Sequence, residues 1–240
     1  MILFGEDKYK SGLKEMWKLC FPMDTGIFID FYFDEVYKND ETLVYFENGK
    51  PVAAFQMIPY ALKNGGEISQ AAYISGAMTH PDFRRKGFMK ELLFASFDIM
   101  QGRGFDYTFL IPQEAWLFDF YAKFGYKTTL PPGNLANQYE NVGPDVPYQE
   151  PCTAYRTPLF THKTIPHEVY IVYSRFLSEI PQVVLKTEKQ FQQILRDFFD
   201  ENGVWLEKEP DFPGEHKGMI RRLNPAAEEI TTLWMGMMLD

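Results

Sequence analysis

The sequence predicts a mixed α/β (α+β) protein, built on a largely antiparallel sheet that is flanked by helices. Strand-like and helix-like segments alternate from residue 1 to about residue 130. Asn48-Gly49 separates two runs rich in β-branched and aromatic residues, which is a strong hairpin signal. The turn "KNGGE" then leads into a third strand. Strands joined by turns this short pair antiparallel, which gives the sheet its predicted character.

The N-terminal elements follow from their residue patterns. "MILF" is a short apolar strand, and "KYKSGLKEMWKLCF" places Leu13, Trp17 and Cys20 at helical spacing. "TGIFIDFYFDEVYK" is a second amphipathic helix, rich in aromatic residues. The hairpin strands cover 42–62, and "AAYISGAMTH" is the third strand. Gly76 in that strand indicates a bulge or a close approach of the backbone to a ligand.

A long helix and three shorter elements complete this region. The stretch "HPDFRRKGFMKELL", residues 80–93, leads into a helix that runs to about Arg103. Its apolar face has i, i+3, i+4 spacing and consists of Met89, Leu92, Leu93, Ser96, Ile99 and Met100. The strand "YTFLIP", the short helix "EAWLFDFYAKFGY" ended by Gly125, and the strand "YKTTLP" follow.

We expect two domains. Residues 1–135 form the first, and 136–151 are a linker, because "LPPGNLANQYENVGPDVPYQEP" has five prolines and no apolar period. Residues 152–240 form a smaller α+β domain with the strands "TAYRTPLF", "GVWLEKE" and "KGMIRRL" and the helices "PHEVYIVYSRFLSEI" and "EKQFQQILRDFFDEN". Their order repeats the opening of the chain, so a truncated internal duplication is a hypothesis.

A final helix is predicted near the end of the sequence. Asn224 is its N-cap and Pro225 its first residue. Its apolar face consists of Ile230, Leu233, Trp234 and Met237. This helix packs against the second domain or contributes to a dimer contact, so a homo-oligomer stays an open alternative.

The composition narrows the classes of function. The formal net charge is −9 at pH 7, which argues against nucleic-acid binding, because that needs a broad basic surface. An acidic protein suits a cationic small molecule, although solubility alone also explains such a charge. The four histidines show no metal-ligand spacing, so we predict no metal.

The expected location follows from the cysteines and from hydropathy. Cys20 and Cys152 stand far apart and in no motif, as a reducing compartment permits. The start "MILFGEDKYK" lacks the apolar stretch of a signal peptide, and no apolar run approaches the ~18 residues of a membrane span. We therefore expect a soluble cytoplasmic protein with no membrane partner.

Positive charge is concentrated at the start of the long helix. Arg84, Arg85, Lys86 and Lys90 surround Gly87 in a protein that is acidic overall. A helix N-terminus exposes N–H groups and attracts anions, whereas cations there oppose the helix dipole unless an anion is bound. The pattern predicts a localised phosphate or pyrophosphate site, and the alternative is a helix with solvated basic residues in its first turn. It matches neither a Walker loop nor the dinucleotide-binding motif.

Two motifs give the chain a resemblance to a known family. "RRKGFM", after a strand and before a helix, resembles the [QR]-x-x-G-x-[GA] signature of the GNAT superfamily of N-acetyltransferases. "FYAKFGY" is similar to that family's F-Y-x-x-x-G-[FY]. The longer stretches "YISGAMTHPDFRRKGFMKELL" and "LIPQEAWLFDFYAKFGY" look closest to Eis-like members, which carry a second, degenerate acetyltransferase-type domain. The resemblance implies a GNAT-type sheet over residues 1–135 and a GNAT-like origin for 152–240.

The resemblance also implies a set of site residues for acetyl coenzyme A. The pyrophosphate loop would consist of Arg84, Arg85, Lys86, Gly87, Phe88 and Met89. The backbone offered to the pantetheine arm, in a splay between two strands, would belong to Gly76, Ala77 and Met78. Tyr121 would be the general acid that protonates the departing thiolate. A backbone amide near Ala77 or Met78 would polarise the thioester carbonyl.

Two positions depart from the family pattern, and a third region borders the acceptor site. Met89 stands where the signature has a small residue, and Glu114 stands where many members have Asn. Glu114 is either a base or amine anchor, or a solvated carboxylate at a helix start. The acids and aromatics from Asp24 to Glu35 suit a cationic amine, or form a core-facing stripe with solvated acids opposite. The acids are Asp24, Asp30, Asp34 and Glu35.

The functional hypothesis is an acetyl-CoA-dependent N-acetyltransferase. It would transfer the acetyl group directly to a primary amine of a cationic small-molecule or peptide acceptor, with acetyl-CoA as cosubstrate. The alternative is a catalytically silent protein that binds an acyl-CoA as a sensor or scaffold. An acyl group other than acetyl is a third reading.

Overall fold

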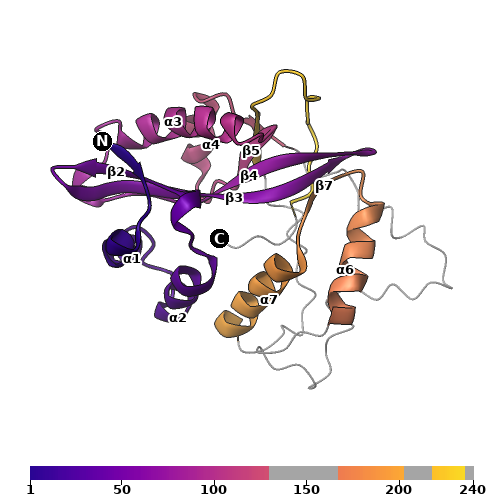
Figure 1. Ribbon diagram of the computed structural model, residues 1–240, viewed down its shortest axis with the longest axis horizontal. Coiled ribbons are helices and arrows are strands. Elements are labelled where there is room, and N and C mark those ends of the chain that lie inside the picture. Colours follow the sequence, from indigo (N-terminus) through magenta and orange to yellow (C-terminus); the bar gives the residue numbers. More distant parts are fainter. Residues whose placement is uncertain (130–166, 203–217, 236–240) are drawn as a thin grey trace.

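The computed structural model describes residues 1–129, 167–202 and 218–235 (Figure 1). The first range contains β1 (Ile2–Phe4), α1 (Asp7–Cys20), α2 (Gly26–Phe31), a π-helical turn (Tyr32–Val36), a 3-10 turn (Asn39–Glu41), β2 (Thr42–Glu47), β3 (Lys50–Asn64), β4 (Glu67–Thr79), a second 3-10 turn (Pro81–Phe83), α3 (Phe88–Gly102), β5 (Tyr107–Leu110), α4 (Ala115–Ala122) and β6 (Lys127–Thr128). The other two contain α6 (His167–Glu179), β7 (Gln182–Leu185), α7 (Glu188–Asn202) and β8 (Met219–Arg222). The order predicted for residues 1 to 130 is the observed order.

The described strands form one sheet. Their order is β1-β2-β3-β4-β5-β8-β6, and β7 pairs with β3 beside this path. Because β3 is 15 residues long, it pairs with β2 along its first half and with β7 along its second half. Among the described strand pairs, β4–β5 alone is parallel. The predicted mixed fold with a largely antiparallel sheet is therefore confirmed.

Helices cover both faces of this sheet and bury two separate clusters of side chains. Figure 1 shows α3 and α4 on one side of the strands, and α1, α2 and α7 on the other. Side chains along β4 alternate between the faces: Tyr73 packs with α1 and α2, whereas Ile74 packs with α3. No helix in the three described ranges is both long and apolar enough to cross a membrane.

The cluster under α1 and α2 and the cluster under α3 both combine aromatic and aliphatic side chains. The rings of Trp17 and Tyr32 lie 4.5 Å apart between centroids. On the other face Leu92, Leu93 and Met100 are fully buried, as the periodicity of the long helix predicts. Each face of the sheet is thus covered by a helix whose apolar side the sequence already indicates.

A bulge bends β4 at Gly76. The strand pairing shifts there, because Ala54 faces Met78 while Gln56 faces Ser75. Gly76 has a φ of +60°, and a Cβ at this position would lie 2.2 Å from the Trp17 ring. Glycine is therefore required for two reasons: the backbone is left-handed, and the Trp17 ring leaves no room for a Cβ atom. The predicted bulge is present.

The described C-terminal elements do not form a sheet of their own. β7 pairs with β3, and β8 pairs with both β5 and β6. Val184 and Ile220 belong to the same cluster as the side chains of α1 and α2. This differs from the expected separate domain at 152–240, and the physical reason is that short strands bury their apolar face by extending an existing sheet. The linker 136–151 and the strands "TAYRTPLF" and "GVWLEKE" lie outside the described residues.

Two further features of the C-terminal region differ from the sequence analysis. The strand β7, with the sequence "QVVL", was not predicted between α6 and α7. The helix predicted from Asn224 is absent from residues 224–235. The Asn224 side chain instead bonds both to Ala226 N (3.0 Å) and to Asp106 Oδ1 (2.7 Å), which anchors a turn.

The chain beyond that turn runs beside β7. Trp234 N donates to Gln182 O (2.9 Å), and Val184 N donates to Trp234 O (3.0 Å). The three consecutive residues from Leu233 to Met235 are buried, which an extended segment between two packed layers permits more readily than a helix with one apolar face. Long-range backbone bonds have overridden the local capping signal.

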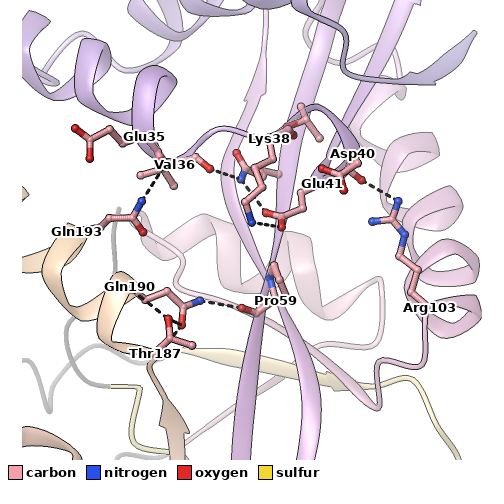
Figure 2. Close-up of polar contacts among 12 residues, drawn as sticks. Glu35, Val36, Lys38, Asp40, Glu41, Pro59, Arg103, Thr187, Gln190 and Gln193 are labelled. Carbon is pink, nitrogen blue, oxygen red and sulfur yellow. Dashed lines mark hydrogen bonds and ion pairs between the residues drawn. The ribbon is translucent and has the colours of Figure 1, made fainter. Parts of the chain in front are cut away.

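Figure 2 shows how α7 is attached to the N-terminal part of the chain. Gln193 Nε2 donates to Glu35 O (2.7 Å) on the π-helical turn, and Gln190 Nε2 donates to Pro59 O (2.9 Å) on β3 (Figure 2). The guanidinium of Arg196 lies 4.8 Å from the centre of the Phe31 ring. Helix α7 is thus fixed beside α2, on the face of the sheet that carries the cluster under α1 and α2.

Candidate active site

A cleft opens where β4 and β5 separate. The two strands pair only from Ala71↔Tyr107 to Tyr73↔Phe109, and β4 continues to Thr79 without β5 beside it. The space between them measures about 560 Å³, part of it open to solvent. The side chains and backbone around it belong to Trp17, Phe21, Asp24, Tyr73, Ile74, Ser75, Gly76, Ala77, Leu110, Ile111, Pro112, Gln113, Leu117 and Tyr121.

At the end of β4 the chain forms a loop of free N–H groups. Arg85 (φ 63°) and Gly87 (φ +89°) both have left-handed backbone conformations. The first bond of α3 runs from Glu91 N to Gly87 O (3.0 Å). The described residues offer no acceptor to the N–H groups of residues 85–90. This run of donors at a helix N-terminus is suited to an anion.

The cations around this loop are exposed and hold no carboxylate. Arg84 Nε donates to Thr79 O (3.2 Å), and Lys86 Nζ lies 4.6 Å from the centre of the Phe83 ring. None of Arg84, Arg85, Lys86 and Lys90 forms an ion pair with another described residue. Their charge is therefore available to an anion bound at the loop.

The other residues predicted for the cofactor take up different positions. Gly76 and Ala77 line the cleft, whereas the Met78 side chain is buried in the cluster under α1 and α2. Phe88 is buried against Tyr45, with ring centroids 4.6 Å apart. Met89 is half-buried against the cluster under α3. Because the side chains of Met78 and Phe88 are buried, these two residues can offer a ligand only their backbone.

Tyr121 lies in the wall of the cleft formed by α4. It is 6% exposed and packs against Phe120 and Tyr126, with ring centroids 5.1 Å and 5.8 Å away. Burial raises the pKa of its hydroxyl to about 12. The described residues form no hydrogen bond with this hydroxyl. A neutral phenol that faces a cleft is a proton donor over the whole physiological pH range.

Tyr126 is a core residue, as expected. Its hydroxyl lies 3.2 Å from Thr108 Oγ1 inside the protein, and burial strongly raises its pKa. Of these two neighbouring tyrosines, Tyr121 is the one that lines the cleft.

The four acids of the acceptor region are sorted by the structure. Asp24 lines the cleft, and its Oδ2 accepts a hydrogen bond from Trp17 Nε1 (2.6 Å). Partial burial raises its pKa, and the Trp17 bond opposes this. The remaining three lie outside the cleft and pair with cations: Asp30 with Lys14 (2.6 Å), Asp34 with Lys10 (3.6 Å) and Glu35 with Arg196.

Glu114 is not part of the cleft lining. It is exposed at the start of α4, where its carboxylate accepts a bond from Trp116 Nε1 (2.7 Å). Its neighbour Gln113 lines the cleft instead. This favours the reading of Glu114 as a carboxylate at a helix start.

Sequence reasoning missed several cleft residues. Trp17 was noted only for its helical spacing in α1, and Phe21 and Ser75 carried no signal. Ser75 is held by the Tyr32 hydroxyl, which donates to its Oγ (2.9 Å). Asp24 could have been separated from the other acids, because it alone precedes the helix that Thr25 caps.

A splayed parallel strand pair that leads to an unsatisfied helix N-terminus defines a class of proteins that bind an elongated, anionic cofactor. The sequence profile of the Acetyltransferase (GNAT) domain matches residues 5–129, just over half of the chain. The chain belongs to the GNAT acetyltransferase family. Among the described residues, no group of three or more His, Cys, Asp and Glu side chains is placed to hold a metal ion.

Solved structures with a similar fold include several acetyltransferases. A GCN5-related N-acetyltransferase from Anabaena variabilis is 18% identical, with a TM-score of 0.46 over 54% of this chain and 32% of that one. Eis1 from Mycobacterium abscessus is 19% identical, with a TM-score of 0.48 over 54% of this chain and 32% of that one. A GNAT family acetyltransferase from Brucella melitensis, in complex with acetyl-CoA, is 15% identical, with a TM-score of 0.42 over 53% and 82%. This chain thus spans about a third of the first two. No curated protein matches the sequence.

Proposed function

We propose that the protein is an acetyl-CoA-dependent N-acetyltransferase that transfers the acetyl group directly to a primary amine of a cationic acceptor. The observation that carries this proposal is the placement of Tyr121 in a cleft whose β4 wall leads into the anion-binding loop. One end of the cleft suits a pyrophosphate and the wall supplies a proton donor.

The loop and β4 divide the work of binding. The N–H groups of residues 85–90 and the cations beside them would hold the pyrophosphate. Beyond Tyr73, the edge of β4 that faces β5 has no strand partner among the described residues. Its free peptide groups would pair with the amides of the pantetheine arm, as an added strand would. The N–H groups near Ala77 and Met78 would then lie close to the thioester carbonyl.

Tyr121 would supply the proton that the leaving thiolate needs. A phenol whose pKa is about 12 stays protonated at neutral pH. An ordinary thiol has a pKa of about 8.5, but the burial that raises the pKa of Tyr121 also raises that of a thiolate formed in the same cleft. The pKa values of the phenol and of the thiol are then closer to each other, so that proton transfer accompanies C–S cleavage.

The finer assignments rest on the sequence. The stretch "YISGAMTHPDFRRKGFMKELL" supports an Eis-like subfamily, and the region after residue 135 extends beyond the matched domain. The sparse cysteines support a cytoplasmic location. The net charge of −9 supports an amine acceptor rather than nucleic acid.

Thermal unfolding with acetyl-CoA tests the binding half of this proposal. Ligand at about 100 times its Kd stabilises the folded state by roughly 2.7 kcal/mol. We expect a clear rise in Tm for the wild type that is lost in Gly87→Glu, because a carboxylate there repels the pyrophosphate. Gly102→Glu, at the other end of α3 where a Cβ also meets open space, should keep the ligand-induced rise.

Release of free coenzyme A thiol in the presence of an amine panel tests the catalytic half. A ligand-induced Tm rise together with amine-dependent thiol release supports an acetyltransferase. A Tm rise without thiol release for any amine would contradict catalysis and favour the sensor or scaffold. No Tm rise in the wild type would contradict both.

A further inference from the structure

Asp24 is the one charged side chain among the described residues that line the cleft. It lies in the loop between α1 and α2, where its N–H donates to Phe21 O (3.2 Å). The rest of the lining is apolar, aromatic or neutral. This single carboxylate is therefore the one negatively charged group that the described lining offers to a ligand.

Trp17 fixes the direction of this carboxylate. The Trp17 ring is 4% exposed and is packed against the bulge at Gly76 and the ring of Tyr32. Its Nε1 donates to Asp24 Oδ2 (2.6 Å), so a side chain that is itself held in place fixes the position of the carboxylate. Asp24 Oδ1 has no hydrogen-bond partner among the described residues, which leaves one oxygen for a ligand.

Among the residues that the structure describes, no cation pairs with Asp24. Asp30, Asp34 and Glu35 each pair with a lysine or an arginine, whereas Asp24 forms no ion pair with a described residue. Burial raises the pKa of Asp24, because the charged form loses hydration without gaining a counter-ion. Such an uncompensated charge in a cleft is destabilising unless a cationic ligand binds to it.

We propose that Asp24 binds the ammonium group of the acceptor and accepts its proton, and that the acceptor is a primary monoamine with an apolar neighbouring group. This rests on the function proposed above. The substrate class follows from the lining: the single carboxylate matches one ammonium, and Trp17, Phe21, Ile111 and Leu117 match an apolar or aromatic group beside it. A polyamine would leave its other charges against apolar walls.

The proton balance of the reaction closes with Asp24 and Tyr121 on opposite walls. Asp24 takes one proton from the ammonium, and the neutral amine then forms a C–N bond with the thioester carbon. The C–S bond breaks and Tyr121 gives its proton to the sulfur. The amide nitrogen returns a proton to the Tyr121 oxygen, directly or through water, and Asp24 releases its own proton to solvent. The environments of the two groups match these roles, because burial makes the Asp24 carboxylate a stronger proton acceptor and keeps the Tyr121 phenol protonated.

The test compares Asp24→Asn with Asp30→Asn. Asparagine keeps an oxygen for the Trp17 bond, and Asp30 is an exposed acid on α2, outside the cleft lining. With saturating acetyl-CoA and benzylamine or phenethylamine, we expect Asp24→Asn to lower kcat/KM by about 10²-fold or more. Asp30→Asn should stay close to the wild type, and spermidine should be a poorer acceptor than benzylamine.

Two further readouts separate this role from a structural one. Wild-type kcat/KM should fall as the pH drops through the pKa of Asp24, and Asp24→Asn should lack this limb. With coenzyme A bound, calorimetry should show that the wild type prefers benzylammonium to benzyl alcohol and that Asp24→Asn does not. Wild-type kcat/KM in Asp24→Asn, or equal affinity for the two ligands in the wild type, would overturn the proposal.

The outcomes also distinguish this proposal from the proposed function. If the wild type acetylates no amine, the proposed function fails, and calorimetry of benzylammonium still decides whether Asp24 is a cation site. If the wild type acetylates amines and Asp24→Asn is unimpaired, the function stands and the assignment of Asp24 is overturned.

Discussion

At the scale of single residues, burial and pairing decide which of several like side chains can react. Tyr121 and Tyr126 are close in sequence and both are buried, yet the Tyr126 hydroxyl lies beside Thr108 while Tyr121 belongs to the lining of the cleft. Asp24 and Asp30 differ in the same way, since Asp30 has Lys14 as a partner. The residue types were visible in the sequence, but their surroundings were not.

The tyrosine pair gives a matched test of the general acid. Tyr121→Phe should lower kcat by roughly 10²- to 10⁴-fold, because the thiolate loses its proton donor. The rise in Tm caused by acetyl-CoA should persist. Tyr126→Phe removes a core hydrogen bond that contributes about 1 kcal/mol and should leave kcat nearly unchanged. Steady-state kinetics of both variants decide the matter, and normal turnover in Tyr121→Phe would contradict its role.

We also expect Asp24 to favour activity at the expense of stability. Its folded-state pKa is raised, so the fold binds this proton more tightly than the unfolded chain, and stability from this group is lost as pH rises through the folded pKa. Asp24→Asn should therefore raise Tm at neutral pH while it lowers activity. Thermal scans at neutral and at acidic pH check this, and the gain should shrink at acidic pH. A Tm gain that does not depend on pH would contradict the explanation.

At the scale of elements, the site depends on two junctions, one in β4 and one at the start of α3. A third feature is the C-terminal segment that lies beside β7. The bulge at Gly76 and the helix start at Gly87 are encoded by glycines within the elements that they shape, so both could be predicted. This C-terminal segment consists of residues 233–235. Lys186, at the end of β7, donates from its Nζ to Met235 O (2.5 Å) and is fully buried near Trp234.

The buried Lys186 makes the stability of the fold depend on pH. Burial lowers the pKa of its ammonium to about 7, whereas an unfolded lysine has a pKa of about 10.4. Between these values the unfolded chain carries a proton that the fold does not, so stability rises with pH through this window. Lys186→Met should therefore raise Tm relative to wild type more at pH 6 than at pH 9. Thermal scans at both values measure this, and an equal difference at the two values would contradict it.

At the scale of the whole molecule, strands from both ends of the chain share one sheet. β7 extends the edge beside β3, and β8 lies between β5 and β6. Leu62 on β3 and Phe109 on β5 are buried at these junctions, with no exposed area. The C-terminal region is thus part of the core that supports the cleft.

This sharing predicts one cooperative unfolding transition. Calorimetry of the full chain should give a single peak whose calorimetric and van't Hoff enthalpies agree. A fragment of residues 1–135 lacks β7 and β8, exposes the edges that they cover, and should not unfold cooperatively. Two separate transitions, or a fragment with a sharp transition of its own, would show two independent domains instead.

The sequence by itself determined the features whose cause is local. Hydrophobic period, turn dipeptides and glycines were enough for the order of elements up to residue 130, the bulge in β4 and the cationic start of α3, because each depends on neighbours within a few residues. Tertiary structure alone decided the rest. β7 and β8 join the first sheet, a turn at Asn224 and a segment beside β7 take the place of a helix, and Asp24 enters the cleft while Asp30 does not. Each of these depends on backbone bonds or burial between segments far apart in the chain, which override local propensity and which no local pattern records.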